Sequence, residues 1–551
     1  MARTKLLMLG LDGATLDVIE PLAAAGRLPN LARWMAAGCS VRLASTVPPV
    51  SFPAWSSLAT GLGPGEHGLF DFTQKLPGAY RLRFVNASDR RGETLFARVT
   101  RAGGRVLSLG MPATWPPEPV NGLLVAGFDA PVSTGTDPTS ASDPGLYAAI
   151  AARVGSWMAP ELDEGAGSGW DEAAADALVR RVRRKTDFAL EALRMLGASA
   201  RGQAPELVSV VFSESDTVAH HFWRDWDAAS PRHDPRAASA RRDAIPSVYE
   251  ALDAACGELR AAVGETALCL VVSDHGAGGA SRRVVHLNRR LAEGGLLARR
   301  VGALDRGARA ARDLVLRALP PGAVQRAFRL AGGRAAAARV ESAARFGGLD
   351  WRRTVVFSEE ANTQPGIWIN LRGRESEGCV APADYERVRS DTIDLLADWK
   401  LPGGGSVVAR ARRREEVYTG ACVDRAPDIV VELALDGGYG LSLVPTPWGA
   451  SDASSIRWLA DDELAGGRGR GMNGTHRPDG ICLEVGAGSE LGLATDAGPG
   501  PALTDVAPAV LHALGIETGS EAGVAPRIAS PYSRAEEAIV AERLRALGYL
   551  E

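Results

Sequence analysis

Acidic and histidine side chains follow the ends of short hydrophobic runs in this chain, and this placement restricts the fold more than any other feature. The residues concerned, each just beyond an apolar run or in a glycine-containing turn, are Asp12, Asp216, His220, Asp274, His275 and His476. The carboxyl ends of parallel strands meet at one edge of an open α/β sheet, so residues beyond them converge on a single crevice. The sequence therefore predicts one site assembled from distant segments.

These side chains are of the kind that binds divalent metal ions. Asp216 and His220 are four residues apart, so a helix that starts after the preceding strand places them on one face. Asp274 and His275 are adjacent and can face two ions. Imidazole and carboxylate ligands suit zinc best among common metals, and Mn²⁺ and Fe²⁺ accept the same ligands. With only 8 histidines in 551 residues, we interpret the set as a metal site.

Composition narrows the class of protein. The net charge of −4 at pH 7 does not favour binding of a nucleic acid polymer, which requires a positively charged surface. The first apolar run leads straight into Asp12, so we interpret it as a core strand and not as a signal peptide. No run approaches the roughly 20 apolar residues of a membrane span. The widely separated cysteines lack a C-x-x-C pair, which favours a reducing compartment and a cytoplasmic location.

The order of apolar and amphipathic segments predicts an α/β fold, with a doubly wound, mainly parallel sheet flanked by helices. Expected strands cover 5–11, 105–111, 123–128, 207–213 and 267–273. Expected helices cover 16–26, 28–38, 93–104, 174–196 and 247–264. Strand-like runs return in TVVFS, GIWINL, DIVVEL and GICLEV, and we expect them to complete the same sheet.

A change in amino-acid composition interrupts this alternation of strands and helices. After about residue 286 the chain becomes rich in Arg and Ala, with Gly and Pro breaks, which predicts a helical insertion or cap. Its Arg side chains could meet an anionic substrate or simply form a solvated helix face. The predicted division is a first core part, the insertion, a second core part and a C-terminal helix, at 1–286, 287–352, 353–530 and 531–551.

Ser51 is the candidate nucleophile. It precedes Phe-Pro and the helix-like segment ASSLATG, and Pro53 fits a first helical turn. A serine at a helix N-terminus meets backbone N–H groups and the positive end of the dipole, which favours an alkoxide and a bound phosphoryl group. The alternative is that Ser51 only caps the helix.

The motifs together resemble the alkaline phosphatase superfamily, most closely its type I phosphodiesterase/nucleotide pyrophosphatase branch. They are GLDG with Asp12, the S-F-P segment, T-G-x-x-P-x-x-H-G at 60–68, S-D-x-x-x-H at 215–220, S-D-H-G at 273–276 and G-T-H at 474–476. Their order along nearly the whole chain makes the combination specific, although each motif alone is weak.

The resemblance implies a two-metal site, usually zinc, with a Thr or Ser nucleophile. One ion would be bound by Asp216, His220 and His476. The other would be bound by a second group with the nucleophile among its members: Asp12, Asp274, His275 and Ser51 Oγ. Coordination lowers the pKa of a hydroxyl, so Ser51 would attack phosphorus and form a phosphoseryl intermediate. The implied partner is a small, nucleotide-like phosphate ester.

Two positions depart from the pattern of related proteins. Nucleotide pyrophosphatases commonly carry an Asn three positions after the nucleophile, where this chain has Ala54, which puts efficiency and nucleotide preference in doubt. Trp55 stands where sulfatases, which share part of this segment, carry an Arg, so a sulfatase is not expected. A phosphomonoesterase or phosphoryl transferase on the same metals remains an alternative. A binding-only relative is disfavoured because every predicted ligand is present.

Overall fold

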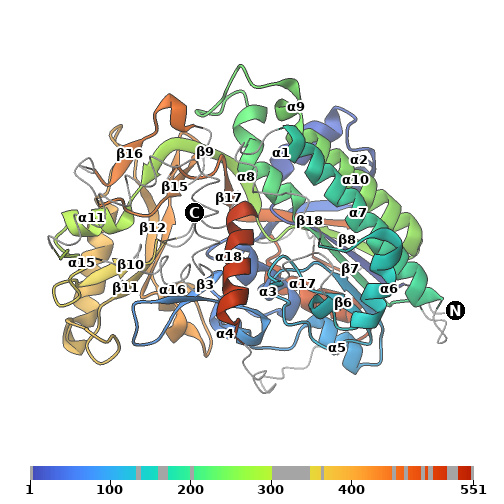
Figure 1. Ribbon diagram of the computed structural model, residues 1–551, viewed down its shortest axis with the longest axis horizontal. Coiled ribbons are helices and arrows are strands. Elements are labelled where there is room, and N and C mark those ends of the chain that lie inside the picture. The colour runs from blue at the N-terminus through green and yellow to red at the C-terminus, as the bar shows by residue number, and fades with distance from the viewer. Residues whose placement is uncertain are drawn as a thin grey trace.

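A seven-stranded sheet organises the protein in the computed structural model (Figure 1), with strand order β2-β18-β8-β1-β7-β5-β6. The structure describes residues 4–131, 138–158, 172–198, 204–300, 346, 348–360, 365–448, 454–464, 470–485, 491–493, 500–517 and 531–547. The strands of the sheet are β1 Leu6–Leu11, β2 Cys39–Ala44, β5 Val106–Leu109, β6 Gly122–Val125, β7 Leu207–Phe212, β8 Leu268–Val272 and β18 Asp479–Val485.

The sheet is mainly parallel, as predicted. Strands β8, β1, β7, β5 and β6 pair in parallel, while β18 is antiparallel to both β8 and β2. Every residue of β1 and β7 is buried, as expected for parallel strands that are covered on both faces. The five strands predicted in the first half of the chain are all present, with ends within three residues of those expected.

Helices cover both faces of this sheet because successive side chains of a strand point to opposite sides. Leu7, Leu9 and Leu11 pack into one core cluster, whereas Leu6 and Met8 pack into the other. The first face is covered by α1 Leu16–Ala24, α2 Pro29–Ala37, α6 Pro144–Val154, α7 Glu172–Gly197, α8 Glu214–Trp226 and α10 Ala244–Val263. The second face is covered by α3 Ser51–Thr60, α5 Leu95–Arg101 and α17 Leu503–Ala513.

The strands of the second half correct one expectation. Of the four strand-like runs expected to complete the central sheet, only β18 joins it. The other three lie in a separate antiparallel sheet made of β10 Val356–Ser358, β11 Gly366–Ile369, β12 Val408–Arg413 and β13 Ile429–Leu433. This sheet has its own hydrophobic cluster, which includes Phe357, Trp368 and Leu396. A short apolar run predicts a buried strand but does not specify its neighbour.

A third sheet extends away from the carboxyl edge of β8. Strand β9 Gly276–Val285 starts one residue after the Asp-His pair and bridges the two halves of the molecule (Figure 1). It pairs with β15 Tyr439–Leu443, β16 Ile456–Trp458 and β17 Gly474–Arg477, and β14 Leu435–Asp436 extends the sheet from β15. His476 therefore lies on β17, beside β9, and not on the central sheet itself.

Shorter elements complete the described chain. They are β3 Thr73–Lys75, β4 Leu82–Phe84, α4 Pro64–His67, α9 Ser239–Arg242, α11 Leu287–Glu293, α15 Tyr385–Ala397, α16 Arg414–Val417 and α18 Arg534–Leu547. Most of the predicted insertion at 287–352, from 301 to 345, is outside the described residues, so the cap and the four-part division remain predictions. No helix among the described residues is both long and apolar enough to cross a membrane.

Candidate metal centre

Five segments bring the predicted site residues to one place. Asp12 directly follows β1, and Asp274 with His275 follows β8 after Ser273. The remaining residues lie on α8, β17 and the first turn of α3: Asp216, His220, His476 and Ser51. All seven residues are buried, with His476 the most exposed at 8%. The convergence predicted from the strand ends is thus present in the structure.

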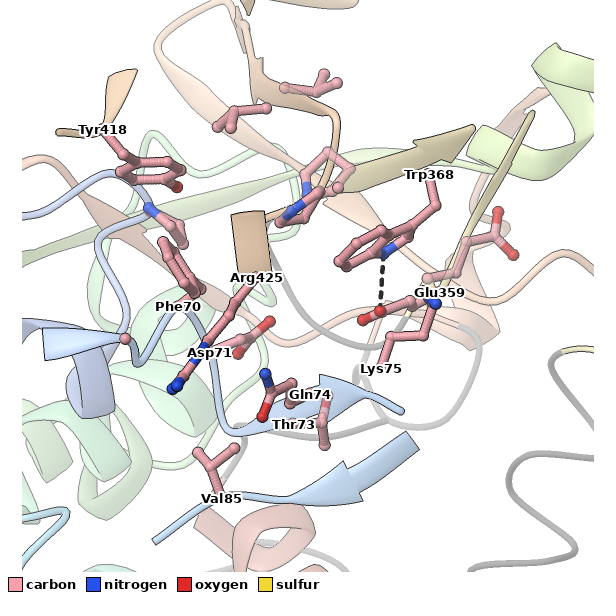
Figure 2. A pocket seen from close by; sticks show the side chains of 18 residues that line it. Phe70, Asp71, Thr73, Gln74, Lys75, Val85, Glu359, Trp368, Tyr418 and Arg425 are labelled. Atoms are coloured by element: carbon pink, nitrogen blue, oxygen red, sulfur yellow. Dashed lines mark hydrogen bonds between the residues drawn. The ribbon is translucent and has the colours of Figure 1, made fainter. Parts of the chain in front are cut away.

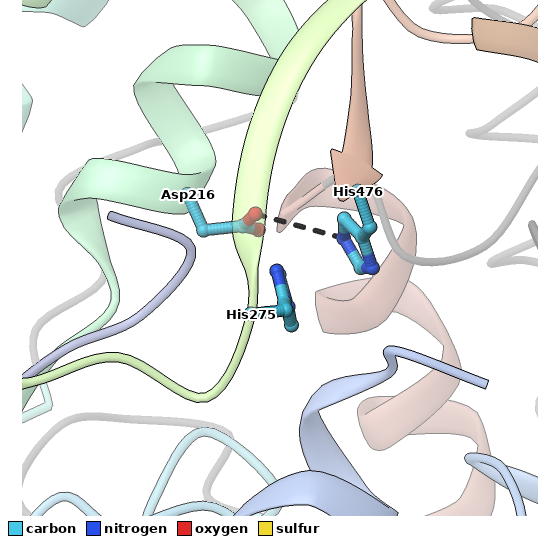
Figure 3. Close-up of side chains that lie close together, drawn as sticks. All are labelled: Asp216, His275 and His476. Atoms are coloured by element: carbon cyan, nitrogen blue, oxygen red, sulfur yellow. Dashed lines mark ion pairs between the residues drawn. The ribbon is translucent and has the colours of Figure 1, made fainter. Parts of the chain in front are cut away.

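One group of ligand atoms is formed by α8 and β17. His220 Nε2 lies 3.2 Å from Asp216 Oδ2, which places the two residues on one face of α8 as their spacing predicts. His476 Nε2 lies 3.6 Å from Asp216 Oδ1 and 3.0 Å from His220 Nε2. Figure 3 shows Asp216 and His476 converging from opposite sides, with the ring of His275 between them and below.

A second group surrounds the nucleophile candidate. His275 Nε2 is 3.7 Å from Asp12 Oδ1 and 3.3 Å from Asp274 Oδ2. Ser51 Oγ is 3.5 Å from Asp12 Oδ1 and 3.4 Å from His275 Nε2. Ligand atoms of Asp12, Asp274 and His275 all lie within 4.8 Å of one another, as do those of a trio formed by Asp216, His275 and His476. His275 stands between the two groups.

The histidine tautomers make these groups suitable for cations. Each Nδ1 faces a backbone carbonyl, that of Gly474 for His220, Gly276 for His275 and Pro49 for His476. A carbonyl only accepts, so Nδ1 donates, and in the neutral form that metal binding requires each ring turns an Nε2 lone pair toward the site. Metal-bound histidines are commonly oriented in this way by their second nitrogen.

The carboxylates are also arranged for cations. Both oxygens of Asp216 and Oδ2 of Asp274 are buried and accept no hydrogen bond among the described residues. Buried carboxylates are normally hydrogen-bonded, paired with a positive charge or bound to metal. The residues present therefore fit a pair of divalent ions.

Charge and burial shift the pKa values in opposite directions across the site. Burial raises the pKa of Asp12 well above its usual range, and the negative charges of Asp274 and Asp216 raise it further. Burial likewise raises the pKa of Asp274. Burial also acts to raise the pKa of Asp216, but the positive charge that His220 carries when protonated outweighs it and lowers the value. The two acids that crowd around His275 thus repel each other unless positive charge is present.

Backbone and indole groups that the sequence analysis did not identify also contact the ligands. Gly13 N donates to Asp274 Oδ1 over 3.1 Å. Gly13 has φ +63°, and a Cβ there would lie 2.6 Å from Asp216 Oδ1, so this position requires glycine. Trp55 Nε1 donates to Asp12 Oδ2 over 3.1 Å. Gly13 belongs to the G-L-D-G motif, whereas the sequence analysis considered Trp55 only as the position where sulfatases carry an Arg.

The sequence allowed two roles for His67, either lining the site or shaping its loop. In the structure its hydrogen bonds stabilise the loop. His67 is fully buried, and its Nδ1 accepts a hydrogen bond from Leu69 N over 3.1 Å. Its Nε2 then donates to Ser57 Oγ over 3.0 Å. Burial lowers the pKa of His67 to about 3. His67 therefore stays neutral and ties the loop after α4 to the helix that carries Ser51.

A hollow that is open to solvent lies between the second sheet and residues 68–85 (Figure 2). Its lining includes Pro48, three residues before Ser51, and aromatic side chains from Phe70, Trp368 and Tyr418. Tyr418 Oη donates to Val47 O over 2.8 Å, which ties this wall to the approach to the nucleophile. Charged and polar residues complete it: Asp71, Gln74, Lys75, Glu359, Glu360 and Arg425.

Comparisons with known proteins identify the family and similar folds. The profile of the type I phosphodiesterase/nucleotide pyrophosphatase family matches residues 6–441, whereas a search of curated proteins gives no significant match. Phosphonoacetate hydrolase from Sinorhizobium meliloti 1021, solved with phosphonoformate, is similar in fold, with TM-score 0.51, 15% identity, and coverage of 94% of this chain and 96% of that chain. Murine ectonucleotide pyrophosphatase/phosphodiesterase 5 matches with TM-score 0.47, 13% identity, and coverage of 95% and 98%.

Proposed function

The chain belongs to the type I phosphodiesterase/nucleotide pyrophosphatase family of the alkaline phosphatase superfamily, and from this premise we propose that it hydrolyses phosphodiesters of small, nucleotide-like organic groups. The observation that carries the proposal is the buried Ser51 hydroxyl, which lies 3.5 Å from Asp12 Oδ1 and 3.4 Å from His275 Nε2. A nucleophile inside a cluster of metal-ligating atoms suits phosphoryl transfer better than it suits a binding-only protein.

Two ions would be held by the residues described above. Asp216, His220 and His476 would hold one, and a group around the nucleophile would hold the other: Asp12, Asp274, His275 and Ser51. Mixed imidazole and carboxylate ligands favour zinc, with Mn²⁺ or Fe²⁺ as alternatives. When bound, the pair supplies Lewis-acid charge that lowers the pKa of a hydroxyl and stabilises the attacking and leaving oxygens.

Ser51 would perform the covalent step. Its Oγ forms a bond to phosphorus while the bond to the ester oxygen breaks, and the leaving alcohol takes up a proton. Water then attacks the phosphoseryl group, releasing the phosphate monoester and restoring the serine. The position of Ser51 in the first turn of α3 adds the positive end of a helix dipole, which favours the negatively charged phosphoryl group.

The organic part of the substrate would lie in the hollow that contains Pro48 and Tyr418 in its wall. Aromatic rings with a few polar groups are typical of small-molecule sites. Ala54, three residues after Ser51, supplies no amide for a non-bridging phosphate oxygen, so backbone groups and bound cations would have to hold the phosphoryl oxygens. Recognition of the organic group therefore becomes more important to affinity.

The proposal is tested by initial rates with bis-p-nitrophenyl phosphate and p-nitrophenyl phosphate, each on zinc-loaded protein with and without chelator. We expect faster hydrolysis of the diester, and we expect chelator to abolish it. Preference for the monoester would replace the proposal with a phosphomonoesterase. Turnover that is unaffected by complete metal removal would contradict the two-metal mechanism altogether.

A further inference from the structure

We propose that Trp55 is a positioning residue that orients Asp12 toward the ion bound beside Ser51. The inference rests on the proposed function. Trp55 Nε1 donates a 3.1 Å hydrogen bond to Asp12 Oδ2. Both side chains are completely buried, so no solvent competes with this contact. A hydrogen bond from a neutral donor to a buried ligand carboxylate fixes its orientation, as partners of metal ligands generally do.

The packing around Trp55 leaves room for the indole to reach Asp12. A Cβ built on Gly10 would lie only 2.7 Å from Trp55 Cη2 and 2.8 Å from a methyl group of Val211. Gly10 lies on β1, two residues before Asp12. A larger residue at this position would push the indole away from the strand end. The missing side chain of Gly10 therefore gives the ring the space it needs to reach the carboxylate.

Trp55 also connects the ligand to the nucleophile. Ser51 and Trp55 are one turn apart on α3 and lie on the same side of the helix. They contact different oxygens of the same carboxylate, since Ser51 Oγ is 3.5 Å from Oδ1 while Trp55 donates to Oδ2. Oδ2 is thereby engaged, and Oδ1 is turned toward Ser51 and His275. One helix thus positions both the attacking oxygen and a metal ligand.

This arrangement specifies how Asp12 would bind. With Oδ2 accepting from the indole, Oδ1 is the oxygen that faces Ser51 and would face the ion. Without the indole the carboxylate could rotate, and the site would lose a preset ligand. The other group, with Asp216, His220 and His476, has no contact with Trp55 among the interactions described, so its affinity should not change.

The experiment is a zinc titration of metal-free protein by calorimetry, with bound metal counted by elemental analysis. We expect wild type to bind two ions. Trp55→Phe should bind one ion with wild-type affinity and the other about 10–100-fold more weakly. Trp399→Phe is the matched control, because Trp399 is also buried and its Nε1 has no hydrogen-bond partner among the described residues; it should bind both ions like wild type.

A second replacement separates the hydrogen bond from ring volume. Substituting Trp55 with benzothienylalanine keeps the shape of the ring but replaces N–H with sulfur. This variant should weaken the binding of the same ion that Trp55→Phe affects. Unchanged affinity of both ions in this variant would overturn the inference, even if Trp55→Phe lowers the melting temperature. A wild-type protein that binds no metal would instead overturn the proposed function.

Discussion

The Nε2 atoms of His220 and His476 lie 3.0 Å apart, and in neutral rings whose Nδ1 atoms donate to the carbonyls of Gly474 and Pro49, both Nε2 atoms carry lone pairs. Two lone pairs at this distance repel each other unless a cation or proton lies beside them. Burial, together with the nearby charge of His275, lowers the pKa of His476 well below its usual value. At His220, burial is outweighed by the negative charge of Asp216, which raises the pKa. Without metal, a proton on His220 relieves the repulsion, and a divalent ion bound by both rings would take the place of that proton.

Ser51→Ala should lower turnover roughly a thousandfold or more while leaving the metal content close to two ions, since other ligands remain in both groups. Steady-state rates and elemental analysis on the same preparation check this. Ser56→Ala is the control, because Ser56 is buried in the same helix and its hydroxyl has no partner among the described residues. Near-wild-type turnover in Ser51→Ala would exclude it as the nucleophile.

The Asp274→Asn variant should bind one metal ion fewer than wild type and should lose its hydrolytic activity. Asp274 accepts from Gly13 N with Oδ1, while Oδ2 lies 3.3 Å from His275 Nε2 and accepts no hydrogen bond among the residues that the structure describes. An amide at this position removes the negative charge that a cation needs. Asp253→Asn provides a comparison, because Asp253 is a buried acid that accepts from the backbone of Asn30 and Leu31. It should lower thermal stability without changing metal content. A fully loaded and active Asp274→Asn enzyme would refute the assignment.

Metal removal should destabilise the folded protein, because Asp12 and Asp274 then repel each other without a compensating cation. Free zinc at about 100 times its dissociation constant should add about 2.7 kcal/mol per site to the free energy of unfolding. Thermal melts across a zinc series, with chelated protein as the baseline, measure this. A melting temperature independent of zinc would argue that the ions do not bind the folded state.

Acid should destabilise the protein in part through His67. Its folded pKa is about 3 against a usual 6.5, so below pH 6.5 the unfolded chain binds more protons, and stability falls as the pH drops toward 3. The slope from this one group reaches about 1.4 kcal/mol per pH unit. In denaturant melts from pH 7 to 4, His67→Asn should begin less stable but lose stability less steeply. Parallel curves would contradict this.

The buried pair of Lys75 and Glu375 should be asymmetric toward mutation. Lys75 Nζ lies 2.8 Å from Glu375 Oε2, and the two side chains are 3% and 0% exposed. Glu375 also forms an ion pair with Arg374 at 3.0 Å. Glu375→Gln leaves a buried ammonium without its partner and should cost about 3–5 kcal/mol. Lys75→Met should cost less, because Arg374 still neutralises Glu375. Equilibrium unfolding compares them, and equal losses would show that Arg374 contributes little.

The two halves of the chain differ in how well their sequence predicted their structure. Buried parallel strands such as β1 and β7 are continuous apolar runs, and the helices between them have clear amphipathic periods, so their positions followed from local patterns. The runs at β10, β11 and β13 were identified as strands but placed in the wrong sheet. Pairing depends on contacts between distant residues, and nothing within a short apolar run records them.

The site shows the same division between local and distant information. Strand ends were sufficient to predict that the six acidic and histidine residues lie together, because residue type and topology determine which groups reach the carboxyl edge of the sheet. Ser51 was added by its position at a helix N-terminus and by the resemblance of the surrounding motif. The sequence could not show that His476 reaches the site from β17, beside β9. Nor could it show that the indole of Trp55 crosses Gly10 to reach Asp12. Those contacts depend on side-chain directions that only the packed tertiary structure sets.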